Sequence, residues 1–376
     1  MNAVIINGEF NVALSVLRSL GKKDIDTTVV ASDRYALSFY SKYCNHKAIS
    51  NYNIDFFKRM SGEDIIMPMD EDVMLLLAKN KQRLRCRLPF SEYSTLEKII
   101  NKSSLIRHAM ENKIPCPKTC FVNGSDTLDG VAKELDFPVV IKPNSGTGGS
   151  GIAIVDSPEE LKNTYRHVLK NYGPASIQEK IPFKEKYKVQ ALLNSDSKAR
   201  RVTVLKVHRA YPLVTGPSVF VETVERPDLV NYSLKLLESL NYYGMADFDF
   251  VIDERNKKPV LMEINPRFWK SIQAAITSGV DYPYLLYKMA IEGDIDVSLN
   301  YKLGVKCRFA IFNDLYRLLT VLRGNYPLSY KLTNLVDYLK FHQDDSYYIF
   351  ELEDVKPFLA LIPIKLHRKF GAKKDT

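Results

Sequence analysis

Cysteine is scarce in this sequence and follows no pattern that suggests a covalent or metal-bound framework. The 376 residues include five cysteines, an odd number, and no Cys-x-x-Cys pair occurs. Cys116 and Cys120 are close together, but the Pro-Lys-Thr linker between them contains no histidine. A disulfide framework and a zinc site are therefore not expected, and a reducing cytoplasm is the predicted location.

The sequence also lacks long apolar runs. No apolar stretch approaches the roughly 20 residues that a membrane-spanning helix needs. Met1–Gly8 has no basic segment and is too short for the apolar part of a secretory leader, so we expect no leader. The apolar stretch Phe358–Ile364 precedes a basic tail, which permits contact with an anionic membrane, although a packed helix with a solvated tail is the preferred interpretation. The tail residues are Lys365, Arg368, Lys369, Lys373 and Lys374.

No set of Ser, His and Asp, or of Cys and His, suggests a protein nucleophile. The net charge of +9 indicates anionic partners, and ATP and nucleic acid are both candidates. No basic motif rich in aromatic residues is present, so we do not expect nucleic acid. With 45% hydrophobic and 26% charged residues, the chain has the composition of a globular protein and the length for two or three domains.

The first part of the sequence alternates between short apolar runs and a helical pattern. We predict strands at Val4–Ile6, Thr27–Ala31 and Asp64–Met67, and a helix over Phe10–Leu20. Alternation of this kind is typical of a parallel sheet covered by helices. A dinucleotide site is not expected here, because only one glycine, Gly8, follows the first strand where the motif needs three.

A glycine-rich loop lies between two apolar runs in the middle of the chain. It follows a predicted helix, Lys98–Asn112, and a predicted strand, Phe137–Pro143, which carries Lys142. The loop Ser145–Gly151 matches the spacing of a dinucleotide motif, but a strand rather than a helix follows it, so that interpretation fails. A hairpin loop with bare N–H groups remains, and such a loop can fold over a triphosphate while Lys142 reaches a phosphate.

The most informative stretch is a predicted hairpin late in the chain. Its first strand is Ala246–Ile252, and the chain turns back over Asp253–Pro259. On the second strand Glu263, Asn265 and Arg267 occupy alternate positions and therefore share one face. Carboxylate and amide oxygens can hold Mg²⁺, and a guanidinium can hold phosphate or carboxylate.

The pattern Glu263-x-Asn265-x-Arg267, after an acidic strand that carries Asp249, resembles the metal- and phosphate-binding signature of the ATP-grasp superfamily. The resemblance implies an α/β chain, with an α+β ATP-grasp fold preceded by a Rossmann-like domain. The implied domains are 1–97 for the Rossmann-like part, 98–295 for the ATP-grasp part with a hinge near 177–183, and 296–376 for a mostly helical extension of unknown role.

The same resemblance assigns roles to individual residues. Asp249, Glu263 and Asn265 are expected to hold Mg²⁺ or Mn²⁺. Arg267 and Arg209 are expected to act on phosphate or on a substrate carboxylate. The expected ATP-binding residues are Lys102, Lys142, the loop residues Ser145, Gly146, Gly148, Gly149, Ser150 and Gly151, the adenine-binding Glu179, Lys180 and Ile181, and Glu185 for the ribose.

The implied activity is that of a carboxylate–amine ligase. Such an enzyme uses Mg-ATP to convert a carboxylate into an acyl phosphate, and an amine then displaces the phosphate. An ATP-dependent carboxylase or carbamoyl-phosphate-type enzyme that uses bicarbonate is the nearest alternative, and a basic nucleic-acid-binding protein is a third. The expected partners are ATP and small-molecule carboxylate and amine substrates, whose identity the sequence does not give, and a homodimer remains open.

Overall fold

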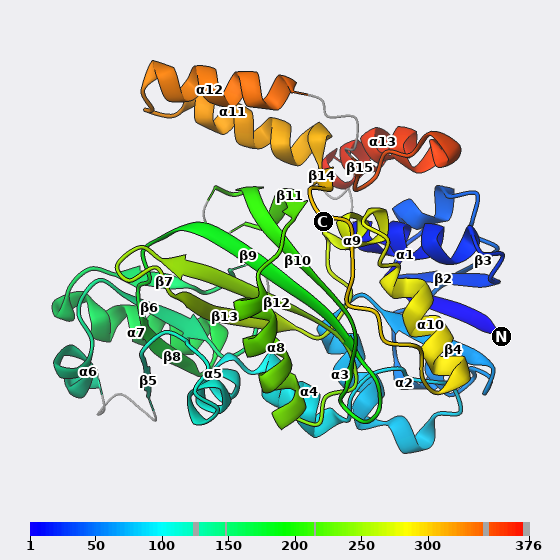
Figure 1. The fold of residues 1–376 in the computed structure, drawn as a ribbon, viewed down its shortest axis with the longest axis horizontal. Helices are drawn as coiled ribbons and strands as arrows, with labels where there is room; N and C mark the ends of the chain where they lie inside the picture. Colours follow the sequence, from blue (N-terminus) through cyan, green and yellow to red (C-terminus); the bar gives the residue numbers. More distant parts are fainter. Residues whose placement is uncertain (123–127, 147–148, 214–215, 341–345, 371–376) are drawn as a thin grey trace.

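The computed structural model of the chain describes residues 1–122, 128–146, 149–213, 216–340 and 346–370. Three β-sheets organise these residues, and each comes largely from its own part of the sequence (Figure 1). One four-stranded sheet lies within residues 2–68, a second within residues 119–179, and a seven-stranded sheet within residues 183–347. Helices cover the sheets, which confirms the predicted mixture of helix and strand.

The first sheet is parallel throughout, with the strand order β3-β2-β1-β4, as the alternating pattern predicted. The turn after β1 needs a glycine, because a Cβ atom on Gly8 would lie 2.4 Å from Cγ1 of Val29. This part of the chain contains β1 (Asn2–Ile6), α1 (Asn11–Gly21), β2 (Thr27–Ala31), β3 (His46–Ile49), α2 (Ile54–Phe57), β4 (Asp64–Pro68) and α3 (Glu71–Lys79).

Two helices, α4 (Tyr93–Ile100) and α5 (Lys102–Glu111), occupy the stretch for which the sequence predicted one helix, Lys98–Asn112. That prediction is wrong. Asn101 is extended, and its side chain accepts a hydrogen bond from the backbone N–H of Ser104, so it caps and starts α5. The apolar pattern hid this break because both helices pack their apolar sides into the same core.

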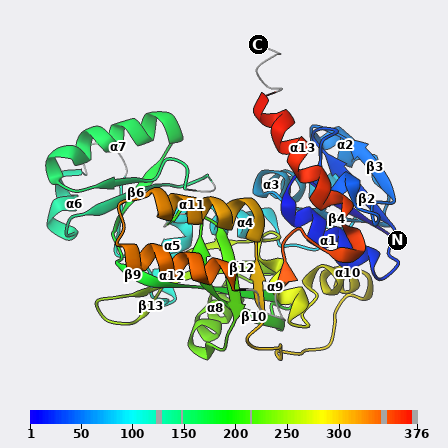
Figure 2. The same ribbon diagram turned by 90° about the horizontal axis from the view of Figure 1, so that it is seen from above.

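The second sheet has the strand order β5-β8-β6-β7, and all its strand pairs are antiparallel. Apolar residues of α6 and α7 pack on it and form a separate small core, and Figure 2 shows the two helices beside this sheet. Its elements are β5 (Thr119–Phe121), α6 (Leu128–Glu134), β6 (Val139–Pro143), β7 (Ala153–Val155), α7 (Pro158–Tyr172) and β8 (Ala175–Glu179).

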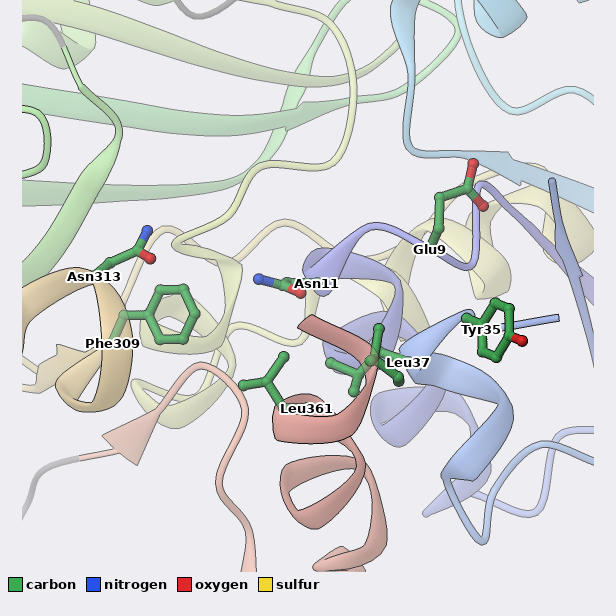
Figure 3. A pocket seen from close by; sticks show the side chains of 8 residues that line it. Glu9, Asn11, Tyr35, Leu37, Phe309, Asn313 and Leu361 are labelled. Carbon is green, nitrogen blue, oxygen red and sulfur yellow. The ribbon is translucent and has the colours of Figure 1, made fainter. Parts of the chain in front are cut away.

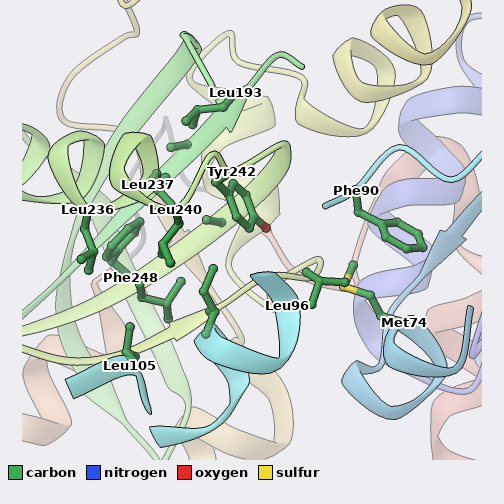
Figure 4. Close-up of a cluster of buried hydrophobic side chains, with 14 of the residues drawn as sticks. Met74, Phe90, Leu96, Leu105, Leu193, Leu236, Leu237, Leu240, Tyr242 and Phe248 are labelled. Carbon is green, nitrogen blue, oxygen red and sulfur yellow. The ribbon is translucent and has the colours of Figure 1, made fainter. Parts of the chain in front are cut away.

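The seven-stranded sheet has the order β13-β12-β9-β10-β11-β14-β15. One of its faces is apolar and packs on α4, α5 and α8, where Phe248 meets Leu96, Leu105 and Leu236 in a common core (Figure 4). The other face carries the polar residues described below. Its elements are β9 (Phe183–Leu193), β10 (Ala199–Ala210), β11 (Ser218–Thr223), α8 (Pro227–Ser239), β12 (Gly244–Asp253), β13 (Pro259–Asn265), β14 (Lys306–Arg308) and β15 (Ser346–Tyr347).

The last part of the chain returns to both the large sheet and the first sheet. The strands β14 and β15, which the sequence did not predict, extend the large sheet, and helices α11 and α12 form a pair beside its edge (Figure 1). Arg18 of α1 donates a 2.9 Å hydrogen bond to the carboxylate of Asp354, which ties this part to the first sheet. The remaining helices are α9 (Ile272–Thr277), α10 (Tyr282–Glu292), α11 (Leu315–Arg323), α12 (Leu328–Leu339) and α13 (Lys356–Phe370). Within the described residues, no helix combines the length and the apolar character needed to cross a membrane.

Candidate active site

Four polar side chains gather on one face of the β12–β13 hairpin. Asp249 lies directly opposite Glu263, and Asp247 lies directly opposite Asn265. Alternate residues of a strand share a face, so these side chains turn away from the phenylalanines that occupy the core. Asp247 and Asp249 are nevertheless buried, and a buried carboxylate is costly unless a charge partner accompanies it.

Strand β9 supplies those charge partners. Nζ of Lys188 lies 2.7 Å from Oδ2 of Asp247 and 3.0 Å from Oδ1 of Asp249, and Nζ of Lys186 lies 3.3 Å from the same Oδ1. The sequence-based predictions missed both lysines, because neither belongs to a motif of the ATP-grasp signature. The available signal was their alternation, Lys186-x-Lys188, which places both on one face of a strand.

Burial and ion pairing act on these charges in opposite directions. Burial opposes ionisation of Asp249, but Lys186 and Lys188 outweigh it and lower the pKa of that carboxyl. Burial raises the pKa of Asp247 in spite of the nearby Lys188. Burial also opposes the charge of Lys188, but the two carboxylates overcome it and raise the pKa of that ammonium. At neutral pH the carboxylate of Asp249 and the ammonium of Lys188 are therefore both ionised.

The donors that this hairpin could offer to a metal are few. In the described part of the chain, no group of three or more His, Cys, Asp and Glu side chains is placed to hold a metal ion. The pair formed by Asp249 and Glu263 remains, with the amide of Asn265 beside it, and Oδ1 of Asp247 is buried without a hydrogen-bond partner among the described residues. Mg²⁺ suits such a set, because it is usually held by one or two carboxylates together with substrate phosphates.

Lys142 and Lys102 approach the hairpin from the second sheet and from α5. Nζ of Lys142 donates to the backbone oxygen of Met262 on β13 at 3.5 Å. Lys142 is buried, and burial lowers its pKa; Glu263 opposes this effect, whereas Lys102 reinforces it. Nζ of Lys102 donates to the backbone oxygen of Gly146 at 2.6 Å. The structure thus brings Lys142 to the acidic hairpin, and Lys102 lies on the glycine-rich stretch, near enough for its charge to act on Lys142.

The glycine-rich stretch connects β6 to β7, which pair as the predicted hairpin. Gly146, Gly149 and Gly151 have positive φ angles of 110°, 82° and 72°. A Cβ atom on Gly151 would also lie 2.5 Å from the ring of Tyr172. This position therefore requires glycine for two reasons, the positive φ angle and the lack of space for a side chain. Of the other predicted loop residues, Ser145 and Ser150 are exposed, and Gly148 lies outside the described residues.

The predicted adenine-binding segment lies at the end of β8. The carboxylate of Glu179 accepts hydrogen bonds from the backbone N–H of Lys118 at 2.8 Å and from Arg255 at 2.9 Å. Lys180 is exposed, whereas Ile181 packs into a small apolar cluster with residues of β12 and β13. The segment therefore joins the second sheet to the large one, as a hinge would, and its contact with adenine stays a prediction.

Glu185, the predicted ribose ligand, lies on β9 next to the site lysines but on the opposite face. Its carboxylate accepts hydrogen bonds from Lys206 at 3.1 Å and from the hydroxyl of Tyr187 at 3.0 Å. Successive residues of a strand point to opposite faces, so Glu185 is separated from Lys186 by the thickness of the sheet. The structure therefore does not bring Glu185 together with Lys186, Lys188 and Asp249.

Arg267 follows β13 and joins the hairpin to the first sheet. Its guanidinium donates to Oδ1 of Asn265 at 3.1 Å, and its Nε lies 3.1 Å from the carboxylate of Glu71, at the start of α3. Burial raises the pKa of Glu71, and Arg267 opposes this effect. The sequence-based predictions missed Glu71. Its position just after a strand of a parallel sheet was the signal, since ligands gather at the carboxyl ends of such strands.

Arg209 lies apart from these residues. Its guanidinium pairs with the buried Asp314 at 2.7 Å and donates to the backbone oxygen of Asp337, near the end of α12, at 3.1 Å. Arg308 donates to the same backbone oxygen at 3.3 Å, and both guanidiniums stack on the ring of Phe220. Cations at the C-terminus of a helix stabilise its exposed carbonyls. The structure thus gives Arg209 a role in docking α12, and its predicted action on substrate stays untested.

Replacing Arg209 with methionine should release α12 without changing ATP affinity. Removing one partner of a buried ion pair costs about 3–5 kcal/mol, because Asp314 would stay buried with less compensation. Hydrogen exchange followed by mass spectrometry should show faster exchange in α12, and Arg323→Met, on the exposed side of α11, should show none. A loss of ATP turnover with unchanged exchange would instead indicate a direct action of Arg209 on the substrate.

Comparison with known proteins places this geometry in a family. The model of the "carbamoyl-phosphate synthase L chain, ATP binding domain" matches residues 101–296. The carbamoyl phosphate synthase large chain of Saccharolobus solfataricus is 21% identical over 236 residues, which is 60% of this chain and 22% of that protein. The chain thus spans about a fifth of the length of the curated relatives it matches.

Two solved structures share the fold. The biotin carboxylase domain dimer of Hydrogenobacter thermophilus 2-oxoglutarate carboxylase, in complex with MgADP, ADP and bicarbonate, superposes with a TM-score of 0.67 at 16% identity, covering 81% of this chain and 73% of that one. The ADP complex of purK, an N5-carboxyaminoimidazole ribonucleotide synthetase, gives a TM-score of 0.68 at 14% identity, covering 90% of this chain and 96% of that one. The predicted ATP-grasp membership is confirmed: the chain belongs to the family of the carbamoyl-phosphate synthase large-chain ATP-binding domain.

Proposed function

We propose that this chain is an ATP-dependent ligase that activates a carboxylate as an acyl phosphate and joins it to an amine, releasing ADP and phosphate. The observation that carries the proposal is the meeting of Asp249 and Glu263 with Lys142 and Arg267 at one place, from separate strands and sheets. We assign residues 1–97 to a Rossmann-like preceding domain, 98–295 to the ATP-grasp domain, and 296–376 to an extension.

Asp249, Glu263 and Asn265 would hold Mg²⁺, as the donor set on the hairpin suggests. The ion would supply positive charge that offsets the charge of the ATP phosphates. Binding requires Asp249 to share its carboxylate between the ion and its two lysine partners. Lys186 and Lys188 would add their positive charge on the same face of the sheet.

In the first step an oxygen of the substrate carboxylate attacks the γ-phosphorus of ATP. The bond between that phosphorus and the oxygen it shares with the β-phosphate breaks, and ADP leaves. Lys142, Lys102 and Arg267 reduce the repulsion between the two anions, so positioning and charge do the catalytic work. The step transfers no proton and needs no protein nucleophile.

In the second step the neutral amine nitrogen attacks the acyl carbon. The bond between that carbon and the phosphate oxygen breaks, inorganic phosphate leaves, and the surplus proton on nitrogen passes to phosphate or water. The names of the relatives favour one alternative, in which bicarbonate is the activated carboxylate. The same residues would serve that reaction, because bicarbonate presents the same attacking oxygen.

ATP should be split to ADP and phosphate in the presence of hydroxylamine and a suitable carboxylate, and the carboxylate should be trapped as a hydroxamate. Hydroxylamine is a small nucleophile that captures acyl phosphates, so it replaces the unidentified amine. Chromatography of the nucleotides and a colour assay for hydroxamate provide the measurement, over a panel of amino acids and small carboxylates. ADP release that needs only bicarbonate would favour the alternative, and AMP as the main product would contradict the acyl-phosphate course.

We also propose a cytoplasmic location for this ligase, and a homodimer remains compatible with it. All five cysteines are free thiols, which is the state expected in a reducing compartment. One solved neighbour is described as a dimer, and the same arrangement of this chain is a further proposal. Size-exclusion chromatography with light scattering measures the assembly directly.

A further inference from the structure

We propose that a cavity between the first sheet and the C-terminal extension binds the amine substrate, and that this amine carries an apolar body. The inference rests on the proposed ligase function and names the class of its second substrate. The cavity has a volume of about 280 Å³, close to the lower limit of typical ligand pockets. Its lining residues, drawn in Figure 3, are Glu9, Asn11, Tyr35, Leu37, Phe309, Asn313, Leu361 and Ile364.

The cavity has an apolar part and a polar part. Leu37, Phe309, Leu361 and Ile364 offer aliphatic and aromatic surface, which favours an apolar group of matching size. Asn11, Asn313, Tyr35 and Glu9 are the polar residues of the lining. In Figure 3 the side chain of Asn11 lies between the group formed by Phe309 and Asn313 and the group formed by Leu37 and Tyr35.

The charge of the lining selects between ligands. Glu9 is the single charged residue among the described lining residues, and the nearby Arg34 donates a hydrogen bond to the hydroxyl of Tyr35 at 2.8 Å. The carboxylate of Glu9 is held in place by the hydroxyl of Tyr52 at 2.7 Å and by the hydroxyl of Ser32 at 3.1 Å. The backbone N–H of Ser32 also donates to this carboxylate at 3.3 Å, so three donors already bind it. A carboxylate has about four acceptor sites, which leaves room for one further donor. An ammonium or amine group is the ligand chemistry that this arrangement favours.

The cavity lies at the edge of the first sheet that faces the ATP-binding residues. β1 and β4 are neighbouring parallel strands, with Ile6 opposite Pro68, so the loops after them are side by side. The loop after β1 carries Glu9, and the loop after β4 leads to Glu71, whose carboxylate contacts Arg267 at 3.1 Å. An amine in the cavity would thus be on the same side of the sheet as the guanidinium proposed to bind phosphate.

None of the lining residues belongs to the part of the chain that matches the family. The matched region is 101–296, whereas the lining residues lie between Glu9 and Leu37 and between Phe309 and Ile364. Phe312, between two of them, has a φ of 74°, a strained conformation that bulky residues adopt mainly where the structure has a use for it. The ATP-binding part is therefore shared with relatives, and the cavity is the part in which this chain sets its own specificity.

The test measures binding of two apolar amines, 3-methylbutylamine and 2-phenylethylamine, to the full chain by isothermal titration calorimetry. Leu361→Trp fills the cavity and should weaken binding at least about tenfold. Leu359→Trp changes the same helix two residues away, where the side chain is 62% exposed, and should leave binding unchanged. Glu9→Gln should weaken binding of the amines about tenfold but not that of the neutral 3-methylbutanol.

The calorimetry and the hydroxylamine assay separate the two proposals. Amines that bind the unchanged chain and Leu361→Trp equally, or that bind neither, overturn the cavity assignment even if hydroxylamine yields ADP and hydroxamate. Amines that bind as expected, in a chain that forms no ADP with any carboxylate and hydroxylamine, leave the cavity assignment standing and overturn the ligase. With both active, Leu361→Trp should raise the KM for the apolar amines and leave the rate with hydroxylamine unchanged.

Discussion

A chain in which glutamine replaces Glu263 should turn over ATP about 10²–10³-fold more slowly than the unchanged chain while folding normally. Glutamine keeps the size of the side chain and one oxygen but removes the negative charge that faces the buried Asp249 across the hairpin. The pair would then offer a metal one carboxylate in place of two, and the ATP phosphates would lose much of the charge that offsets them. ADP release measures the effect, and circular dichroism reports the fold.

Glu254→Gln is the matched control for this change. Glu254 lies at the turn of the same hairpin, and its carboxylate is paired with Lys184 at 2.6 Å on the surface. Surface pairs contribute about 0–1 kcal/mol, so this variant should retain both its fold and its turnover. If Glu263→Gln kept full ATP turnover with an unchanged circular dichroism spectrum, Glu263 would not be a metal ligand.

The hairpin that carries the acids could be predicted from the sequence because its information is local. Alternation of apolar and polar residues indicated that Glu263 and Asn265 share a face, and the turn at Asp253–Pro259 indicated the hairpin. The exact pairing is not local information: a β-bulge between Phe250 and Asp249 shifts the register, so Asp249 lies opposite Glu263 instead of Met262. Lys142 could be predicted for the same reason, since it lies on a short apolar strand just before a glycine-rich loop. Each of these residues belongs to a pattern of a few neighbours.

Contacts between distant segments could not be predicted in this way. Glu71 reaches Arg267 across almost 200 residues of sequence, and Lys188 reaches Asp247 across 59. Neither pair follows from periodicity, because the packing of the sheets decides which strands become neighbours. Arg209 shows the same limit, since its partner Asp314 lies in the extension, whose two short strands gave no clear pattern.

Buried charges of opposite sign balance one another on the face of the large sheet that carries Asp247 and Asp249. Asp247 and Asp249 lie on β12, and Lys188 lies between them on β9, within 3.0 Å of an oxygen of each. All three are buried, so each depends on the others for its ionised form. A change at the central lysine should therefore alter stability more than any surface change of the same kind.

Replacing Lys188 with methionine should lower the free energy of unfolding by about 3–5 kcal/mol. Methionine has a similar length and fills the space, so the change removes charge rather than volume and leaves two carboxylates buried without their main partner. Urea unfolding measures the loss, with the fluorescence of Trp269, the single tryptophan and a buried one, as the probe. Lys184→Met, at an exposed lysine four residues away, should leave the unfolding midpoint unchanged.

The pH dependence separates loss of charge pairing from poor packing. Without Lys188, burial should raise the pKa of Asp247 in the folded chain further above its unfolded value, whereas Asp249 keeps Lys186 at 3.3 Å and should lose only part of the lowering of its pKa. The folded variant would then bind more protons than its unfolded form, so its stability falls as pH rises through the range between those values. In the unchanged chain burial also raises the pKa of Asp247, but Lys188 limits this rise, and the pKa of Asp249 is lowered, so the contribution of Asp249 is lost as pH falls. The difference in the free energy of unfolding between the two chains should thus become smaller on acidification from about pH 7 to about pH 4. Adding Asp247→Asn to the Lys188→Met variant should make this difference smaller at neutral pH. If the difference in the free energy of unfolding did not change with pH, the loss of stability in Lys188→Met would be due to poorer packing.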